Sequence, residues 1–299
     1  MASRARVALM KSLGAVLEVL PERADVAMAR RLARRLGPRN TLAKANLERN
    51  LAHALFAERH VDSLSSDAAL LARFVDRAFA SYGQYWAEGA KLPALRQGVI
   101  DDRFAISEGM EHLVAARESR QGLVVALPHV GSWEWGGSFL NSLGLGMTAI
   151  AEELEPPALF EWFKKKRESI GIRIEPLNEH AGTVMLEVLR GGGVVGLLCD
   201  RDLQGNGVEV DFFGERVTMP AGPATLALRS GATLLVAACY SGPGRDHHAV
   251  VTAPIDTTRY GKLRADVSRV TQLIAHELEG LIARAPEQWH VLQPLFVEP

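Results

Sequence analysis

The 299-residue chain contains only two cysteines, Cys199 and Cys239. So few cysteines exclude a disulfide framework, and because each adjoins an apolar run, we expect buried free thiols in a reducing compartment. Long hydrophobic runs are also missing. The longest early stretch, 7–20, is interrupted by Lys11 and Glu18, which leaves it short of the roughly 20 residues of a membrane-spanning helix and argues against a signal-peptide core. We therefore expect a cytoplasmic chain that at most rests on a bilayer surface.

Several catalytic signatures are absent. The chain has no Gly-x-Ser-x-Gly elbow, no His-Glu-x-x-His, no paired Cys-x-x-Cys and no Walker loop. The glycine-rich string 191–196 matches a dinucleotide fingerprint as text, but a predicted helix precedes it and a predicted strand follows it, which is the reverse of the required order. These glycines are expected to end a helix. We expect neither a metal ion nor a cofactor.

The charge of the chain is divided unevenly. The net charge is −1, yet residues 1–50 contain eleven Lys and Arg against four Asp and Glu. Such an asymmetry indicates that the amino-terminal part meets an anionic surface. Nucleic acid is not the expected partner, because the arginines are not interleaved with aromatic residues and no nucleic-acid-binding module is recognisable.

Two amphipathic helices are predicted near the amino terminus, over residues 5–20 and 26–36. In the second, the arginine arc comprises Arg30, Arg31, Arg34 and Arg35, and the apolar arc comprises Met28, Ala29, Leu32, Ala33 and Leu36. Such a helix can lie in the membrane interface, where each cation near anionic lipid adds about 1 kcal/mol. It can also pack its apolar arc on the core and leave its arginines in water. The pattern alone leaves both interpretations open.

From about residue 100 onward, strand-like and helical stretches alternate, which predicts a mostly parallel sheet with helices on both faces. The apolar runs are 123–127, 172–176, 194–198, 233–238 and 248–252, and the helical stretches are 107–118, 135–143, 156–170, 181–190, 222–230 and 263–284. No repeat or clear linker divides the chain. We expect one α/β domain over residues 1–299, in which a helical, basic, membrane-associating part (1–95) packs against an α/β catalytic body (96–299).

The most informative residue for chemistry is His129. It follows the apolar run 123–127, and Glu134 stands five positions further on; Asp200 follows the apolar run 194–198 in the same way. Because ligands of open α/β sheets bind at the carboxyl ends of the strands, these two charged strand ends are expected to form one site. A proton-transferring histidine needs an acceptor on its other ring nitrogen, and either acid can serve. The structural alternative is a histidine that caps the next helix.

Two arginines are candidate ligands for a substrate. Arg167 ends a predicted helix, and Arg201 adjoins the second carboxylate. A guanidinium fork suits a phosphate group, provided that the fold brings these side chains close to His129. Most single surface arginines bind no substrate, so this assignment depends on the fold.

Longer strings strengthen these hypotheses. They are LPHVGSWEWGG, KRESIGI, LLCDRDLQGNGVEVDFFGE and MPAGPATLALRSGA, with GPRNTLAKANLERNL and SYGQYWAEGAKLP upstream. Together they resemble the late (lauroyl/myristoyl) acyltransferases of bacterial lipid A biosynthesis, and within that family they resemble most the phosphatidylinositol mannoside acyltransferases. The resemblance runs in the same order over residues 20–295.

The resemblance implies a glycerolipid-acyltransferase-like fold and a peripheral enzyme at the cytoplasmic face of the plasma membrane. Its basic helices would meet the anionic inner-membrane surface, its donor would be acyl-CoA as co-substrate, and its acceptor would be a sugar hydroxyl of a glycolipid. It implies His129 as general base without an acyl-enzyme, with Glu134 at the acidic position of the broad family and Asp200 at that of the mannoside group. Arg167, Arg201, Trp133 and Glu152 make up the predicted substrate-binding set.

Some positions depart from the pattern of the mannoside group. Ser132 and Glu134 stand where that group has asparagine and aspartate, Asp200 stands where it has glutamate, and Glu153 replaces a basic residue. The shorter acid leaves the partner of His129 open, and Glu153 leaves the acceptor sugar open. The same chemistry on another glycolipid, such as a lipid A precursor, is one alternative. A non-catalytic lipid carrier with an apolar tunnel is another.

Overall fold

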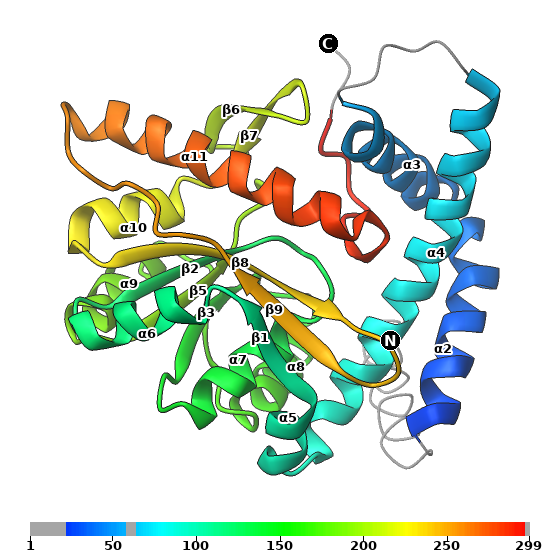
Figure 1. Ribbon diagram of the computed structural model, residues 1–299, viewed down its shortest axis with the longest axis horizontal. Helices are drawn as coiled ribbons and strands as arrows, with labels where there is room; N and C mark the ends of the chain where they lie inside the picture. The colour runs from blue at the N-terminus through cyan, green and yellow to red at the C-terminus, as the bar shows by residue number, and fades with distance from the viewer. Residues whose placement is uncertain (1–21, 58–63, 297–299) are drawn as a thin grey trace.

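The computed structural model describes residues 22–57 and 64–296. Its centre is a seven-stranded sheet in the order β1-β9-β8-β2-β5-β3-β4 (Figure 1). The strands are β1 (Phe104–Glu108), β2 (Leu123–Leu127), β3 (Met147–Ala151), β4 (Arg173–Pro176), β5 (Val194–Leu198), β8 (Thr233–Ser241) and β9 (His247–Val251). All neighbours pair in parallel except β8 and β9, which form a hairpin. The prediction of a single α/β domain with a mostly parallel sheet is confirmed.

Helices cover both faces of the sheet. All five residues of β2 are buried, as expected for a strand with helices on either side. One face carries α9 (Ala181–Arg190), α10 (Gly222–Ser230) and α11 (Leu263–Arg284), and the other carries α5 (Gln97–Arg103), α6 (Met110–Ser119), α7 (Trp133–Ser142) and α8 (Pro157–Glu168). Each layer of helices encloses its own hydrophobic core.

A separate two-stranded hairpin follows β5. It consists of β6 (Val208–Phe212) and β7 (Glu215–Met219) and packs against α11. Phe213 and Gly214 connect the strands with φ angles of 49° and 80°. Positive φ at both central residues is the geometry of the type I′ turn, which matches the twist of a tight hairpin.

Three helices lie beside the α/β body (Figure 1). They are α2 (Glu22–Leu36), α3 (Thr41–Phe56) and α4 (Leu64–Lys91), and short 3₁₀ turns occupy Gly37–Arg39, Leu92–Ala94 and Pro286–Gln288. The helices α2 and α4 approach closely at Gly83, where a Cβ atom would come within 2.5 Å of the Ala29 carbonyl oxygen. No helix in the described part of the chain is both long and apolar enough to span a bilayer.

The outward face of α2 is partly apolar. Met28, Leu32 and Leu36 are 44%, 51% and 42% exposed. The arginines divide between the two sides: Arg30 donates to Gln84 and Arg34 pairs with Asp76 on α4, whereas Arg31 and Arg35 are exposed. The interpretation that the whole apolar arc packs on the core is therefore wrong. The helix predicted over residues 5–20 lies outside the described residues.

The structure adds strands that the pattern did not predict. The segment Phe104–Glu108 is β1, so the helix expected over 107–118 begins only at Met110, after Gly109 with φ 80°. The strand β3 and the hairpin β6–β7 were also missed. Both cysteines are buried and free, as predicted.

Candidate active site

The loops that follow β2 and β5 bring His129 and Asp200 together. The two strands pair in parallel with Leu127 opposite Leu198, so each side chain lies two positions beyond a paired end. The Nδ1 atom of His129 lies 2.5 Å from Oδ1 of Asp200, and the backbone N–H of His129 donates to Oδ2 at 2.8 Å. The acid in contact with the imidazole is therefore Asp200.

The carboxylate of Asp200 is fully buried and accepts three hydrogen bonds. The third comes from Nε1 of Trp289, which donates to Oδ2 at 2.8 Å. Burial alone would raise the pKa of this carboxyl, but the charge of His129 and the hydrogen bonds from His129 and Trp289 outweigh it and lower the pKa. The His129 side chain is 27% exposed, and its Nε2 has no hydrogen-bond partner within the described residues. Nε2 is thus free to face a substrate.

Glu134 has partners other than His129. It lies in the first turn of α7, is 6% exposed, and its Oε1 accepts hydrogen bonds from the Tyr85 hydroxyl and from Nη2 of Arg167, both at 3.0 Å. The guanidinium of Arg167 lies 4.9 Å from the ring centroid of Trp133. Burial, reinforced by the charge of Glu134, raises the pKa of Tyr85, so the phenol stays protonated and donates. Glu134 therefore orients Arg167 and Tyr85.

The remaining predicted ligands lie at the same edge of the sheet. Glu152 follows β3 and is exposed, and its Oε2 lies 3.8 Å from Nη2 of Arg201. The side chain of Arg201 is mostly covered. Burial raises the pKa of the nearby Tyr82 hydroxyl, and the charge of Arg201 partly opposes that rise. The carboxyl ends of β2, β3 and β5 thus carry the predicted site residues of their loops.

Unpaired polar atoms gather at this site. Buried side-chain N and O atoms nearly always have a hydrogen-bond partner. Of the six buried side-chain atoms in the described segments that have none, three belong to Ser132, Glu134 and Arg201. Polar groups of a bound ligand can supply the missing bonds. No cluster of His, Cys, Asp and Glu suited to a metal ion occurs in residues 22–57 and 64–296.

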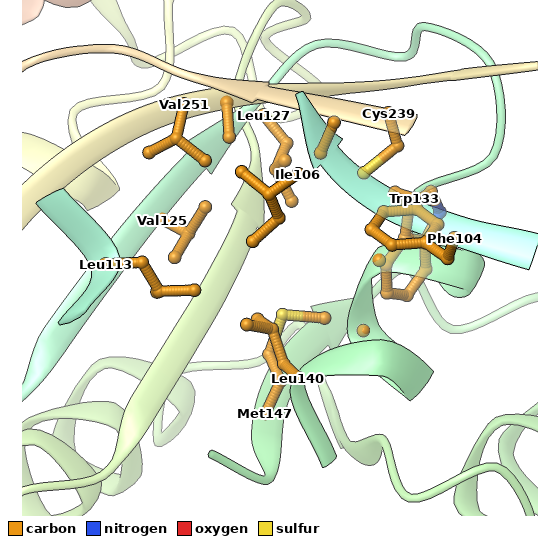
Figure 2. Close-up of a pocket in the computed structure, with 14 residues that line it drawn as sticks. Phe104, Ile106, Leu113, Val125, Leu127, Trp133, Leu140, Met147, Cys239 and Val251 are labelled. Carbon is orange, nitrogen blue, oxygen red and sulfur yellow. The ribbon is translucent and has the colours of Figure 1, made fainter. Parts of the chain in front are cut away.

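An apolar cavity lies between the sheet and the layer of α6 and α7 (Figure 2). The volume of the cavity is about 40 Å³. Its wall is formed by Phe104, Ile106, Leu113, Val125, Leu127, Trp133, Gly136, Gly137, Leu140, Met147, Ala237, Cys239, Ala249 and Val251. Two of these, Leu127 and Trp133, lie two and four positions from His129 in the sequence, while His129 itself is not part of the wall.

Sequence reasoning missed several residues of the site. Tyr85 comes from α4, and Trp289 and His290 come from the segment after α11. Burial, followed by the charge of His129, lowers the pKa of His290 to about 3, so this second imidazole stays neutral. The sequence signal was weak. Trp289 and His290 stand alone near the carboxyl terminus, and no spacing connects them to Asp200.

Comparisons with known proteins identify the relatives of this chain. The sequence model described as "Bacterial lipid A biosynthesis acyltransferase" matches residues 2–298. A phosphatidylinositol mannoside acyltransferase of Mycobacterium tuberculosis (strain CDC 1551 / Oshkosh) is 39% identical over 218 residues, which cover 72% of this chain and 67% of that protein. The protein of that name from Mycolicibacterium smegmatis is 36% identical over 224 residues, which cover 74% of this chain and 71% of the other.

One solved structure is similar at a much lower level. It is the 1-acyl-sn-glycerophosphate acyltransferase PlsC from Thermotoga maritima, with a TM-score of 0.36 and 15% sequence identity. The alignment covers 83% of this chain and 98% of that chain.

Proposed function

Because the chain belongs to the bacterial lipid A biosynthesis acyltransferase family and is an acyltransferase, we propose that it transfers a long acyl chain from acyl-CoA to a sugar hydroxyl of a phosphatidylinositol mannoside. The observation that carries the proposal is the 2.5 Å contact between Nδ1 of His129 and Oδ1 of Asp200 just beyond the carboxyl ends of β2 and β5. A lipid carrier has no use for such a pair.

In the proposed reaction His129 acts as general base. Its Nε2 takes the proton of the sugar hydroxyl as the hydroxyl oxygen attacks the thioester carbonyl carbon, while Asp200 stabilises the imidazolium that forms. The tetrahedral intermediate collapses by breaking the C–S bond, and the imidazolium returns its proton to the departing thiolate. A thiolate leaves readily, so no acyl-enzyme is required.

The apolar cavity is the proposed site of the acyl chain of the donor. Its lining is almost entirely apolar, and it includes Leu127 and Trp133, which precede and follow the His129 loop in the sequence. Burying a chain contributes about 0.8 kcal/mol per CH₂, or roughly 10 kcal/mol before costs for a sixteen-carbon chain. Arg201 and the basic last turn of α8, which includes Lys165, offer cations for phosphate groups of the substrates.

The acceptor is proposed from the relatives, which are named phosphatidylinositol mannoside acyltransferases. The unpaired atoms of Ser132, Glu134 and Arg201 support a polar acceptor, since a sugar carries hydroxyls that both donate and accept.

We further propose that α2 seats the protein on an anionic membrane. Met28, Leu32 and Leu36 recur every fourth residue and are exposed, and Arg31 and Arg35 lie between them on the surface. An exposed apolar stripe beside free cations is typical of an interfacial helix. This would hold the enzyme at the cytoplasmic face of the plasma membrane, in reach of a lipid acceptor.

The reaction is tested with purified protein, palmitoyl-CoA and either a phosphatidylinositol mannoside or a lipid A precursor, with the products identified by mass spectrometry. We expect acylation of the mannoside and its loss in His129→Ala. Acylation at the wild-type rate by His129→Ala would refute the mechanism, and turnover of the lipid A precursor alone would refute the acceptor. Stoichiometric acyl-CoA binding without turnover on any acceptor would make the protein a carrier.

The membrane proposal is tested by sedimentation with vesicles of phosphatidylglycerol and phosphatidylcholine. Replacing Met28, Leu32 and Leu36 together by serine should release most of the bound protein. The control is Leu273→Ser, which removes an exposed leucine from α11. Equal sedimentation of the triple variant and the wild type would remove α2 from the membrane-binding surface.

A further inference from the structure

The last described residues lie against the His129 loop. Residues 286–296, here called the C-terminal strap, follow α11 and run beside α3 (Figure 1). Val130 and Trp289 form an antiparallel bridge, the N–H of Gly131 donates to the Gln288 carbonyl at 2.9 Å, and the N–H of His290 donates to the His129 carbonyl at 2.8 Å. The strap is therefore tied to the backbone of the His129 loop by one antiparallel bridge and its two hydrogen bonds.

The strap also reaches the acid. The Trp289 indole is 1% exposed, and its N–H is one of the three donors to the Asp200 carboxylate. Trp289 thus holds the carboxylate through its side chain, and its two neighbours, Gln288 and His290, hold the imidazole loop through their backbones. Any displacement of the strap changes the orientation of both partners at once.

Two buried asparagines of α3 donate hydrogen bonds to the strap residues that follow His290. The Nδ2 of Asn50 donates to the carbonyls of Val291 and Gln293 at 2.9 and 3.0 Å, and the Nδ2 of Asn46 donates to the Leu292 carbonyl at 3.1 Å. Three successive strap carbonyls are thereby fixed by one helix. Both asparagines come from the string GPRNTLAKANLERNL, which the proposed reaction does not otherwise use.

We propose that the C-terminal strap is a brace that positions His129 and Asp200 for proton transfer, and that Asn50 and Asn46 act on the reaction through it. The physical reason is geometric. A base that must meet a substrate hydroxyl loses rate when it moves by a fraction of an ångström, while the sites that bind the two substrates stay intact. Trp289, Asn50 and Asn46 are thus positioning residues. Their effect on rate rests on the proposed base role of His129.

The test uses Trp289→Phe and Asn50→Leu in the full chain. The first removes the indole N–H but keeps an aromatic ring, and the second removes the amide that holds two strap carbonyls. We expect kcat to fall about 10- to 100-fold in each, with the KM for acyl-CoA and for the acceptor unchanged. We also expect both variants to shift or broaden the far-downfield proton resonance given by a short imidazole–carboxylate hydrogen bond.

The matched control is Thr271→Val, which deletes a buried hydrogen bond of 2.7 Å within α11 without touching the strap. It should preserve both kcat and the resonance. A wild-type resonance and kcat in Trp289→Phe and Asn50→Leu would overturn the proposal, as would equal losses in Thr271→Val. Should the wild-type protein acylate no acceptor, the proposed function fails, and the resonance alone then decides whether the strap positions the pair.

Discussion

Neutralising Asp200 should affect the reaction far more than neutralising Glu134, although Glu134 is much closer to His129 in sequence. In Asp200→Asn, one carboxylate oxygen becomes an NH₂ group. If that group faces Nδ1 of His129, the imidazole proton must move to Nε2, which then cannot accept a proton from the substrate. If it faces the other way, it opposes the N–H groups of His129 and Trp289.

The expected loss of kcat in Asp200→Asn follows from these two orientations of the amide. Either arrangement removes the correct tautomer or disrupts the site, and the same acid-to-amide change in a Ser-His-Asp triad lowers kcat by about 10⁴-fold. A loss of that size corresponds to roughly 5.5 kcal/mol of transition-state stabilisation. Glu134→Gln keeps an oxygen that accepts from Tyr85 but leaves the charge of Arg167 uncompensated in a mostly buried position. That change should lower the free energy of unfolding by about 3 kcal/mol and kcat by tenfold or less.

Both variants are measured by thiol release from acyl-CoA in the presence of the acceptor, at a temperature at which each is folded by circular dichroism. Thermal unfolding of the same samples gives the stability difference. A loss of about 10⁴-fold in Glu134→Gln with near wild-type activity in Asp200→Asn would refute the assignment of Asp200 as the partner of His129.

Three further predictions concern the membrane, the donor and acid stability. Replacing Arg31 and Arg35 by Gln should weaken sedimentation with anionic vesicles but not with neutral ones, and an unchanged profile on anionic vesicles would contradict the role of these cations. Leu140→Trp should narrow the cavity and shift kcat/KM toward shorter acyl chains; an unaltered chain-length profile would place the chain elsewhere. Because burial lowers the pKa of His290 to about 3, the unfolded chain binds one proton more than the folded chain between pH 6.5 and 3. The free energy of unfolding therefore falls as the pH falls, by up to about 1.4 kcal/mol per pH unit. In His290→Gln this slope, measured by urea unfolding, should be smaller.

The fold was predictable where strands are apolar throughout. The runs 123–127 and 194–198 coincide with β2 and β5, because a parallel strand covered on both faces needs no polar alternation. The strand β3 is interrupted by Thr148, and the edge strand β1 ends in Ser107 and Glu108, so neither is apolar throughout. The β6–β7 hairpin escaped detection because its turn is Phe213-Gly214, which lacks the usual Asn-Gly or Asp-Gly signal.

The site was only partly predictable for a similar reason. A sequence shows that His129 and Asp200 each follow a strand, but it does not show that β2 and β5 are neighbours in register. The sequence therefore left Glu134 open as an equal candidate, although the first turn of α7 directs it to Tyr85 and Arg167. Contacts between distant parts of the sequence, such as that of Trp289 with Asp200 across 89 residues, leave no periodic pattern at all.

The two buried acids considered as partners of His129, Asp200 and Glu134, differ in how their charge is compensated. This difference decides which of them can assist a base. The charge of Glu134 is already balanced by the guanidinium of Arg167 at 3.0 Å. Apart from the imidazole, Asp200 accepts only from an indole N–H and a backbone N–H, and both donors are neutral. These donors fix the carboxylate without cancelling its charge, so that charge remains available to the imidazolium that forms when His129 takes a proton. A second cation on Asp200 would remove this advantage, and the described structure has none there.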